Sequence, residues 1–182
     1  MKKELKLTGS GGQGLILAGV ILADAALLDG KHVIQSQSYG PEARGGASKA
    51  EVIISDSEID FIKVQKCDML LCLTQAAYDK YGREKAAVLI LDERLSIMDN
   101  AALMSNASPM EPERIVKIPI LDTALEKLGK PMVANIVALG ALNGLLNLVS
   151  KESLVKAVLN RVPRGTEDLN NQALEAGYEL VG

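Results

Sequence analysis

Aromatic side chains are scarce in this sequence. Its 182 residues include no tryptophan, one phenylalanine and four tyrosines. A surface that stacks the bases of single-stranded nucleic acid needs several aromatic rings, so this class of protein is excluded. An excess of one charge is also lacking, since 20 Lys and Arg face 23 Asp and Glu. This near balance argues against binding to DNA or to an anionic membrane surface.

Cysteine and histidine are equally rare, and only Cys67, Cys72 and His32 are present. Two cysteines cannot form a disulfide framework, and such a pair cannot hold an iron–sulfur cluster by itself. Because an odd number of positions separates them, we expect two core or strand-end thiols on opposite faces of one strand. A single histidine excludes a histidine-rich metal site, and His32 is expected to be a solvated residue at a strand edge.

Long apolar runs are lacking as well. The N-terminus has no apolar signal segment and passes directly into a strand-like run, so we expect a cytoplasmic protein. Residues 132–149 come nearest to a membrane span, but Asn135, Asn143 and Asn147 interrupt them at multiples of four. This spacing predicts a polar stripe on a buried or interface helix. The stripe either contacts a partner or satisfies its amides internally.

The first part of the chain alternates strands and helices. Residues 5–8 are typical of a strand and residues 15–28 of a helix, which Gly30 should cap at its C-terminal end. A strand at 32–35 would complete a βαβ unit, parallel and right-handed. The pattern then predicts, in order, strand 49–55, short helix 58–66, strand 68–74, helix 75–81, and strands 87–91 and 114–118. Residues 92–113 show too little periodicity for any element to be assigned.

The last third of the chain is helical in pattern. Helices are predicted at 121–128, 133–149, 153–159 and 167–180, and Thr166 is expected to cap the last one. With 48% hydrophobic and 24% charged residues, the composition is that of a globular protein. We therefore predict one domain over residues 1–182, of the α/β class, with a mostly parallel sheet flanked by helices and a helical C-terminal segment.

A glycine motif lies between the first strand and the first helix. Gly9, Gly11 and Gly14 satisfy G-x-G-x-x-G, which makes the predicted fold Rossmann-like. Glycines let the backbone approach a ligand, and the helix N-terminus offers N–H groups to a phosphate. The acidic residue that holds the ribose of NAD is missing, because the second strand ends in Gln-Ser-Gln. The loop therefore either contacts another phosphate or cofactor, or lets helix and strand pack closely.

A second glycine-rich loop follows the second strand. Its Gly-Pro and Gly-Gly pairs predict unusual turns, while Arg44 supplies a planar fork that suits phosphate or carboxylate and Glu42 could pair with it. Since the carboxyl ends of parallel strands meet at one edge, both loops should open on the same edge of the sheet. We favour a binding or subunit-contact role over a plain surface turn with an internal ion pair.

The candidate residues for cofactor binding or subunit contact come from both loops: Gly9, Ser10, Gly11, Gly12, Gln13, Gly14, Ser38, Tyr39, Gly40, Pro41, Glu42, Arg44, Gly45 and Gly46. No catalytic residue and no metal ligand is predicted, because no Ser-His-Asp or metal-ligand spacing is present. Such poverty in acid–base groups suggests that the chemistry belongs to a cofactor or to another subunit.

At these two loops the sequence resembles the gamma subunit of the 2-oxoacid:ferredoxin (acceptor) oxidoreductases. The resemblance rests on residues 9–14 with the helix after them, on residues 38–46, and on the strand at 50–55. The strand at 68–71, the length and the order of the elements fit as well, so the resemblance covers nearly the whole chain. The first glycine motif alone is weak, but its combination with S-Y-G-P-E-x-R-G-G is specific.

The resemblance implies a subunit of a complex that oxidatively decarboxylates a 2-oxoacid with coenzyme A, giving acyl-CoA, carbon dioxide and reduced ferredoxin. It implies alpha and beta subunits that hold thiamine diphosphate and magnesium, and a ferredoxin-like subunit or ferredoxin with iron–sulfur clusters. No cofactor is assigned to this chain alone. The length is most like that of the 2-oxoglutarate or branched-chain oxoacid type. We expect the two loops to face the partner subunits, with Arg44 near a coenzyme A phosphate or an acidic neighbour.

One alternative remains open at this point. A self-contained Rossmann-like protein that binds a nucleotide or flavin as a homodimer would explain the first glycine loop, although not the second. A homodimer of the isolated chain is compatible with either interpretation.

Overall fold

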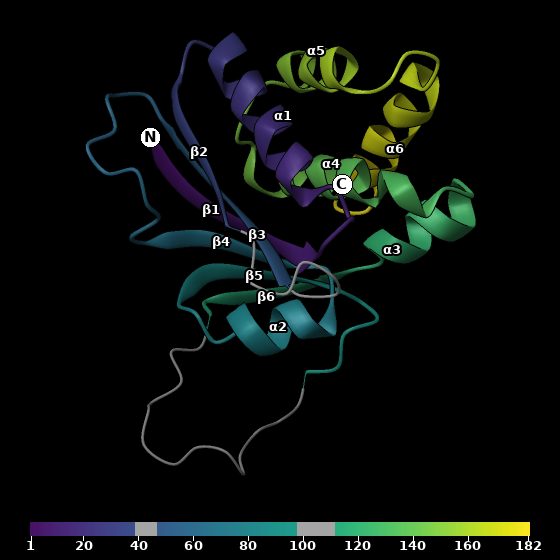
Figure 1. Ribbon diagram of the computed structural model, residues 1–182, viewed down its shortest axis with the longest axis horizontal. Helices are drawn as coiled ribbons and strands as arrows, with labels where there is room; N and C mark the ends of the chain where they lie inside the picture. Colours follow the sequence, from purple (N-terminus) through teal and green to yellow (C-terminus); the bar gives the residue numbers. More distant parts are fainter. Residues whose placement is uncertain (39–46, 98–111) are drawn as a thin grey trace.

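The computed structural model describes residues 1–38, 47–97 and 112–182. Six strands form one mixed sheet in the order β2-β3-β1-β4-β5-β6 (Figure 1). Their bounds are β1 Lys2–Ser10, β2 His32–Ser38, β3 Ala47–Ser55, β4 Cys67–Cys72, β5 Ala86–Asp92 and β6 Arg114–Ile118. The predicted α/β fold with helices flanking a sheet is confirmed.

One strand breaks the parallel pattern. β1, β4, β5 and β6 pair in parallel, whereas β3 is antiparallel to both of its neighbours, β1 and β2. β2 thus runs in the direction of β1, as predicted, but β3 lies between them. The predicted βαβ unit is wrong in one respect, because its two strands, β1 and β2, are not neighbours in the sheet. The antiparallel strand β3 lies between them and pairs with both. The apolar side chains of Val52 and Ile54 on β3 bury it in the main core, next to β1.

Helices cover the two faces of the sheet unequally. α1 Leu15–Leu28, α4 Ala134–Leu146, α5 Lys151–Arg161 and α6 Glu167–Glu179 share the main apolar core on one face. On the other face lies the short α2 Gln75–Tyr81, which packs in a smaller apolar cluster (Figure 1). No helix in the described ranges is long and apolar enough to cross a membrane.

The first helix is apolar along almost its whole length. Asp24 is its only charged residue, so α1 can pack against both the sheet and the C-terminal helices. Gly30 ends it at φ 73°, a left-handed conformation that suits glycine, and donates its N–H to Leu27 O at 3.0 Å. The predicted bounds of α1 and its glycine cap are both confirmed.

The C-terminal helices cross at glycines. A methyl group at Gly140 would overlap Leu174 O, and one at Gly177 would overlap Val137 O, so the α4 and α6 backbones are in direct contact. Thr166 precedes α6 as predicted, but its hydroxyl makes no capping bond to a helix N–H. It donates to Pro163 O at 2.7 Å instead, so that part of the prediction is wrong.

Three other predicted helices differ in detail. The segment predicted as helix 121–128 consists of a short α3 at Ile120–Asp122 and a π-helical stretch at Thr123–Lys127. The segment predicted as helix 133–149 starts with a 3-10 turn at Pro131–Val133 and ends at Asn147, which is left-handed with φ 48°. α5 is longer than predicted, because Ser150 caps it by accepting from Ser153 N at 3.2 Å.

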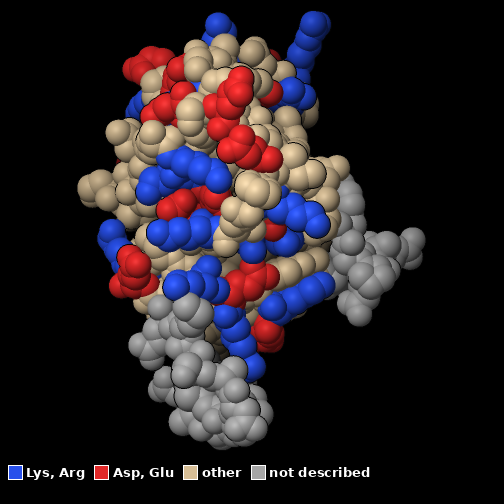
Figure 2. Space-filling model, turned by 90° about the vertical axis from the view of Figure 1, so that its left-hand side faces the viewer, with Lys and Arg blue, Asp and Glu red and all other residues tan. Residues whose placement is uncertain are grey.

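Residues 56–66, which join β3 to β4, are irregular, so the predicted helix at 58–66 is wrong. The cause is a distant side chain. The buried carboxylate of Glu4 on β1 accepts hydrogen bonds from the N–H groups of Gln65 and Lys66, at 2.5 and 2.9 Å. These two N–H groups therefore cannot donate to the carbonyl groups four residues earlier, as they would in a helix. This segment lies at the amino ends of the parallel strands, where Figure 2 shows charged side chains of both signs interspersed on the surface.

Candidate functional site

The first glycine loop is a tight, self-bonded turn. β1 ends at Ser10, whose N–H donates to Gln13 Oε1 at 2.8 Å, and Gln13 N donates back to Ser10 O at 3.3 Å. Gly12 and Gly14 have φ values of 88° and 72°, a left-handed conformation that other residues adopt only with strain. The Gln13 side chain therefore closes the turn, and the glycines permit it.

The glycines of the motif do two different things. A methyl group at Gly9 would overlap Gln13 Oε1, and one at Gly14 would lie 2.6 Å from Asn135 Nδ2. Around Gly11 and Gly12, in contrast, no atom of the described residues lies within 4 Å of such a methyl group, and both residues are exposed. The structure thus gives Gly9 and Gly14 a packing reason. Contact of Gly11 and Gly12 with a ligand or partner stays a prediction.

The turn delivers the chain to the N-terminus of α1. Gly14 precedes the helix, no side chain caps it, and no acidic residue lies in its first turn. Gly14 O accepts from Ala18 N at 2.9 Å and from Asn135 Nδ2 at 3.2 Å, so α4 is tied to the loop. The positive end of the helix dipole is therefore not neutralised by the helix itself.

The second loop starts and ends beside the first. In the sheet register Ser10 pairs with Ala47, and Ser38 pairs with Lys49. Ser48 Oγ also donates to Gly9 O at 3.3 Å. The strands that flank both loops therefore meet at one edge, as expected. Of the second loop's candidates only the exposed Ser38 is described. The others lie outside the described residues: Tyr39, Gly40, Pro41, Glu42, Arg44, Gly45 and Gly46.

The neighbouring strand adds residues that sequence reasoning missed. Thr74, after β4, accepts from Ala77 N at 3.3 Å and caps α2. Gln75 exchanges two hydrogen bonds with the backbone of Ser96, at 3.0 and 3.2 Å. Because α1 and α2 cover opposite faces, β1 and β4 form the point where the connections diverge, a frequent place for ligands in α/β sheets. Thr74 and Gln75 closely follow the buried strand β4, and this position is the sequence feature that could have indicated them.

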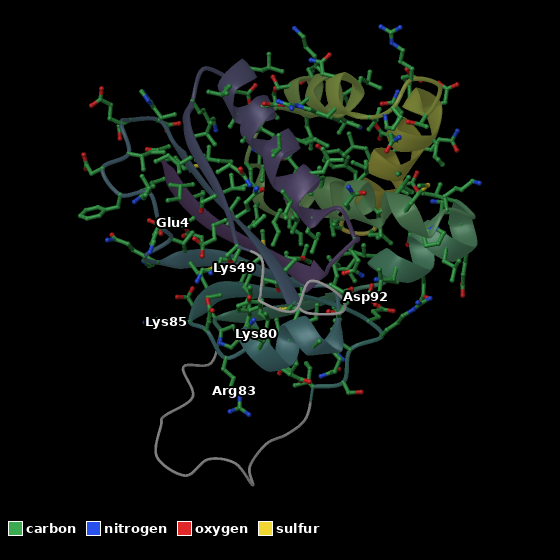
Figure 3. All side chains as sticks on the ribbon, viewed as in Figure 1. Glu4, Lys49, Lys80, Arg83, Lys85 and Asp92 are labelled. Carbon is green, nitrogen blue, oxygen red and sulfur yellow. The ribbon has the colours of Figure 1, made fainter. Side chains whose placement is uncertain are left out.

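Asp92 is a third missed residue at this edge, and Figure 3 shows it at the opposite end of the sheet from Glu4. It is fully buried at the end of β5, where it accepts from Arg94 N at 3.0 Å and from Leu121 N at 2.8 Å. Burial raises the pKa of the Asp92 carboxyl, although these two N–H groups oppose the rise. Both of its oxygens are occupied, so Asp92 holds the turns after β5 and before α3.

The asparagines of the predicted stripe on α4 form most of their hydrogen bonds within the chain itself. Asn143 donates to Val149 O at 2.9 Å and to Tyr178 Oη at 2.7 Å, and its Oδ1 accepts from Leu148 N and Val149 N. Asn135 is buried against Gly14, as described above. Asn147 is exposed and ends the helix. Of the two alternatives, internal satisfaction therefore applies to Asn135 and Asn143.

The two cysteines are free and buried. Burial raises the pKa of Cys67 to about 12 and that of Cys72 to about 11. Both pack in the smaller cluster beside α2, so the expectation that they face opposite sides of the sheet is wrong. Cys67 stands at the start of β4, where its Sγ turns to donate to Met69 O. The prediction of core or strand-end thiols is confirmed, as is the exposed position of His32.

The comparison with known proteins is decisive for the family. The model of the family described as "Pyruvate ferredoxin/flavodoxin oxidoreductase" matches residues 4–180. The chain belongs to this family. The 2-oxoglutarate synthase subunit KorC of Methanocaldococcus jannaschii is 53% identical, over 100% of this chain and 95% of that protein. The pyruvate synthase subunit PorC of Methanothermobacter marburgensis is 32% identical, over 98% of this chain and 97% of that protein.

A solved structure agrees. The gamma subunit of a keto/oxoacid ferredoxin oxidoreductase from Geobacter sulfurreducens has a TM-score of 0.81 at 46% identity, over 100% of this chain and 97% of that chain. The resemblance to gamma subunits of 2-oxoacid:ferredoxin oxidoreductases is therefore confirmed. So is the predicted class, a subunit of an oxidoreductase complex.

The described residues of this chain offer few side chains that could bind a metal ion or an iron–sulfur cluster. Within residues 1–38, 47–97 and 112–182, no three His, Cys, Asp or Glu side chains gather in a way that could hold a metal ion. The two thiols are buried, and their raised pKa values disfavour the thiolate that an iron–sulfur cluster needs. The described residues do not fit a cluster or a magnesium ion, and we assign no step through either group to this chain.

Proposed function

We propose that this chain is the gamma subunit of a complex that converts 2-oxoglutarate and coenzyme A to succinyl-CoA and carbon dioxide, with reduction of ferredoxin. The observation that carries the choice of oxoacid is the difference in identity, 53% to a 2-oxoglutarate synthase subunit against 32% to a pyruvate synthase subunit. The whole of residues 1–182 is proposed to act as one gamma-type domain, which the family match over 4–180 supports.

The proposed partners are alpha and beta subunits that bind thiamine diphosphate with magnesium, and a ferredoxin-like subunit or ferredoxin with iron–sulfur clusters. Thiamine diphosphate supplies the decarboxylation chemistry where it is bound. The lack of a ligand set among the described residues of this chain favours that division of labour. We also propose a cytoplasmic location, which the two unpaired thiols support, since a reducing compartment keeps thiols free.

The role proposed for this chain is to form one wall of the site where its partners work. Gly11 and Gly12 expose backbone without side chains beside the N-terminus of α1. Such a surface lets a partner backbone or an anionic group approach closely, and the strands that flank the second loop end at the same edge. In this proposal the two loops position a partner group or coenzyme A and exclude water, and they do not themselves react.

Purification of the tagged chain from its native host under gentle conditions tests the subunit role. We expect thiamine-diphosphate-binding and ferredoxin-like chains to co-purify, and the complex to prefer 2-oxoglutarate to pyruvate in a ferredoxin-reduction assay. Recovery of the chain without such partners would contradict the subunit role. A complex that prefers pyruvate would contradict only the choice of oxoacid. Tight binding of a flavin or nicotinamide nucleotide to the chain alone would favour a self-contained enzyme.

Arg44→Ala in the assembled complex tests the contact with coenzyme A. Loss of the guanidinium fork should raise the KM for coenzyme A about 10-fold. Arg44→Lys keeps the charge and should lie between the variant and the wild type. Arg164→Ala, in the exposed turn before α6, is the matched control and should change nothing. If Arg44→Ala left coenzyme A affinity, assembly and turnover at wild-type values, the assignment of Arg44 would be wrong.

A further inference from the structure

The amino-end segment, residues 56–66, forms neither helix nor strand, but it is bonded to the rest of the chain at both of its ends. At one end the ammonium group of Met1 lies 2.5 Å from Asp56 Oδ2, and Ser57 N donates to Ser55 Oγ at 3.1 Å. At the other end the Glu4 carboxylate holds two backbone N–H groups, as described above. What this segment presents to solvent is therefore held in place from both sides.

It presents an apolar tip. Phe61, the only phenylalanine of the chain, is 58% exposed, and its neighbour Ile62 is 68% exposed. Two adjacent large apolar side chains at the surface offer a partner apolar area to cover, on a segment that is held at both ends. Buried aromatic anchors of this kind dominate the binding energy of protein interfaces.

The charges on either side of the tip are ordered by sign. Glu58 and Asp60 precede Phe61, whereas Lys63 and Lys66 follow Ile62, and all four are exposed. None of the four has an ion pair within the part of the chain that the structure describes. A segment whose sequence is acidic before an apolar centre and basic after it is complementary in charge to a second copy that runs in the opposite direction.

From this symmetry we infer that the amino-end segment is the contact between two copies of this chain, related by a two-fold axis through the tip. Phe61 and Ile62 pack against the same pair of the second copy. Asp60 of each copy then faces Lys63 of the other, as an isologous contact requires. This self-complementary order of charges is the observation that favours a second copy as the occupant.

This contact is independent of the proposed function. The tip lies at the amino ends of the parallel strands, and the glycine loops lie at their carboxyl ends, so a second copy at one end leaves the other end free. Figure 1 shows the two ends on opposite sides of the molecule. The interface could therefore join two gamma subunits within a larger complex, and equally two copies of the isolated chain.

Sedimentation velocity of the full chain over a wide range of concentration tests the contact. We expect a reversible dimer, and Phe61→Asp should raise its dissociation constant about 30-fold, as loss of an interface anchor does. Leu27→Asp is the matched control, because Leu27 on α1 is equally 58% exposed, and it should leave the dimer intact. A monomer at all concentrations, or a dimer that Phe61→Asp does not weaken, would overturn the inference.

Charge exchange identifies the occupant. Asp60→Lys and Lys63→Asp should each weaken the dimer about 10-fold, since each sets like charges against one another. The double variant should restore the dimer, and so should mixing the two single variants, because opposite charges face each other again. Failure of both rescues would overturn the inference and favour a different protein as the occupant. Thermal unfolding of each variant checks that it is folded.

Discussion

The two ends of the sheet are held by different means. At the carboxyl end, glycines close the turn after β1, and Gly11 and Gly12 leave bare backbone at the surface. At the amino end, the buried Glu4 carboxylate clamps an irregular segment whose exposed side chains project outward. In the two proposals made above, a partner group approaches the backbone closely at one end, and exposed side chains project towards a second copy at the other.

The difference also shows how each end depends on distant parts of the chain. The glycine turn makes its own hydrogen bonds through Gln13 and needs α4 only for the contact of Asn135 with Gly14. The amino-end segment has no such local bonds at Gln65 and Lys66, because their N–H groups reach Glu4, some 60 positions earlier. We therefore expect the amino end to be the more sensitive to a single substitution.

Glu4→Ala should give the largest loss of stability. It leaves the backbone N–H groups of Gln65 and Lys66 without their charged acceptor and removes the partner of Lys2, so we expect the free energy of unfolding to fall by about 3 kcal/mol. Urea unfolding followed by circular dichroism measures the loss. Glu58→Ala, an exposed change in the same segment, should stay within about 0.5 kcal/mol of the wild type.

The loss should also depend on pH. Burial alone would raise the pKa of the Glu4 carboxyl, but Lys2 and the N–H groups of Lys66 and Gln65 outweigh it and lower the pKa below its ordinary value of 4.5. A lowered pKa stabilises the fold above that value, and the stabilisation is lost as pH falls below it. The difference between wild type and Glu4→Ala should therefore narrow in acid. An unchanged difference at low pH would contradict the role given to the carboxylate.

Gly14→Ala should cost less, about 2 kcal/mol, because alanine is strained at φ 72° and its methyl group would press on the amide of Asn135. Gly11→Ala is the matched control within the same loop, since its methyl group would meet no atom of residues 1–38, 47–97 and 112–182. Its unfolding free energy should hardly change. If Gly11→Ala destabilised the fold as much as Gly14→Ala, the division of the glycines into packing and exposed positions would be wrong.

Local signals were enough for much of the fold. The bounds of α1, α2 and β6 follow from apolar periodicity and from breaks at residues such as Gly30, and the structure has the same bounds. The family resemblance rested on two loops whose flanking strands do meet at one edge. Patterns of this kind are contained within a short stretch of sequence, so they can be interpreted without knowledge of the rest.

What could not be predicted depends on contacts between distant residues. The insertion of β3 between β1 and β2 is a choice of pairing partner, and hydrophobic pattern alone does not make it. The false helix at 58–66 reflects the bond to Glu4, and the contact of Asn135 with Gly14 spans more than a hundred positions. Asp92 fell at the start of the stretch 92–113, for which no element could be assigned, and only the fold shows that both of its oxygens are bound.

The two thiols offer the most delicate test, because Cys67 begins β4 at the amino end and Cys72 ends it at the carboxyl end. Burial raises both pKa values well above neutrality, so alkylation of the native chain at pH 7 should be very slow at both sites. Mass spectrometry of iodoacetamide-treated protein measures each site separately, and both should react once the chain is unfolded.

Substitutions at each end should then act on the nearer thiol. Glu4→Ala releases the segment that leads into Cys67, so alkylation there should rise more than at Cys72, whose Sγ lies 3.3 Å from Thr8 Oγ1 in the core. Gly14→Ala should show no preference for Cys67. An equal rise at both thiols in Glu4→Ala would mean that the sheet opens as one cooperative unit, and that the two ends are not held independently.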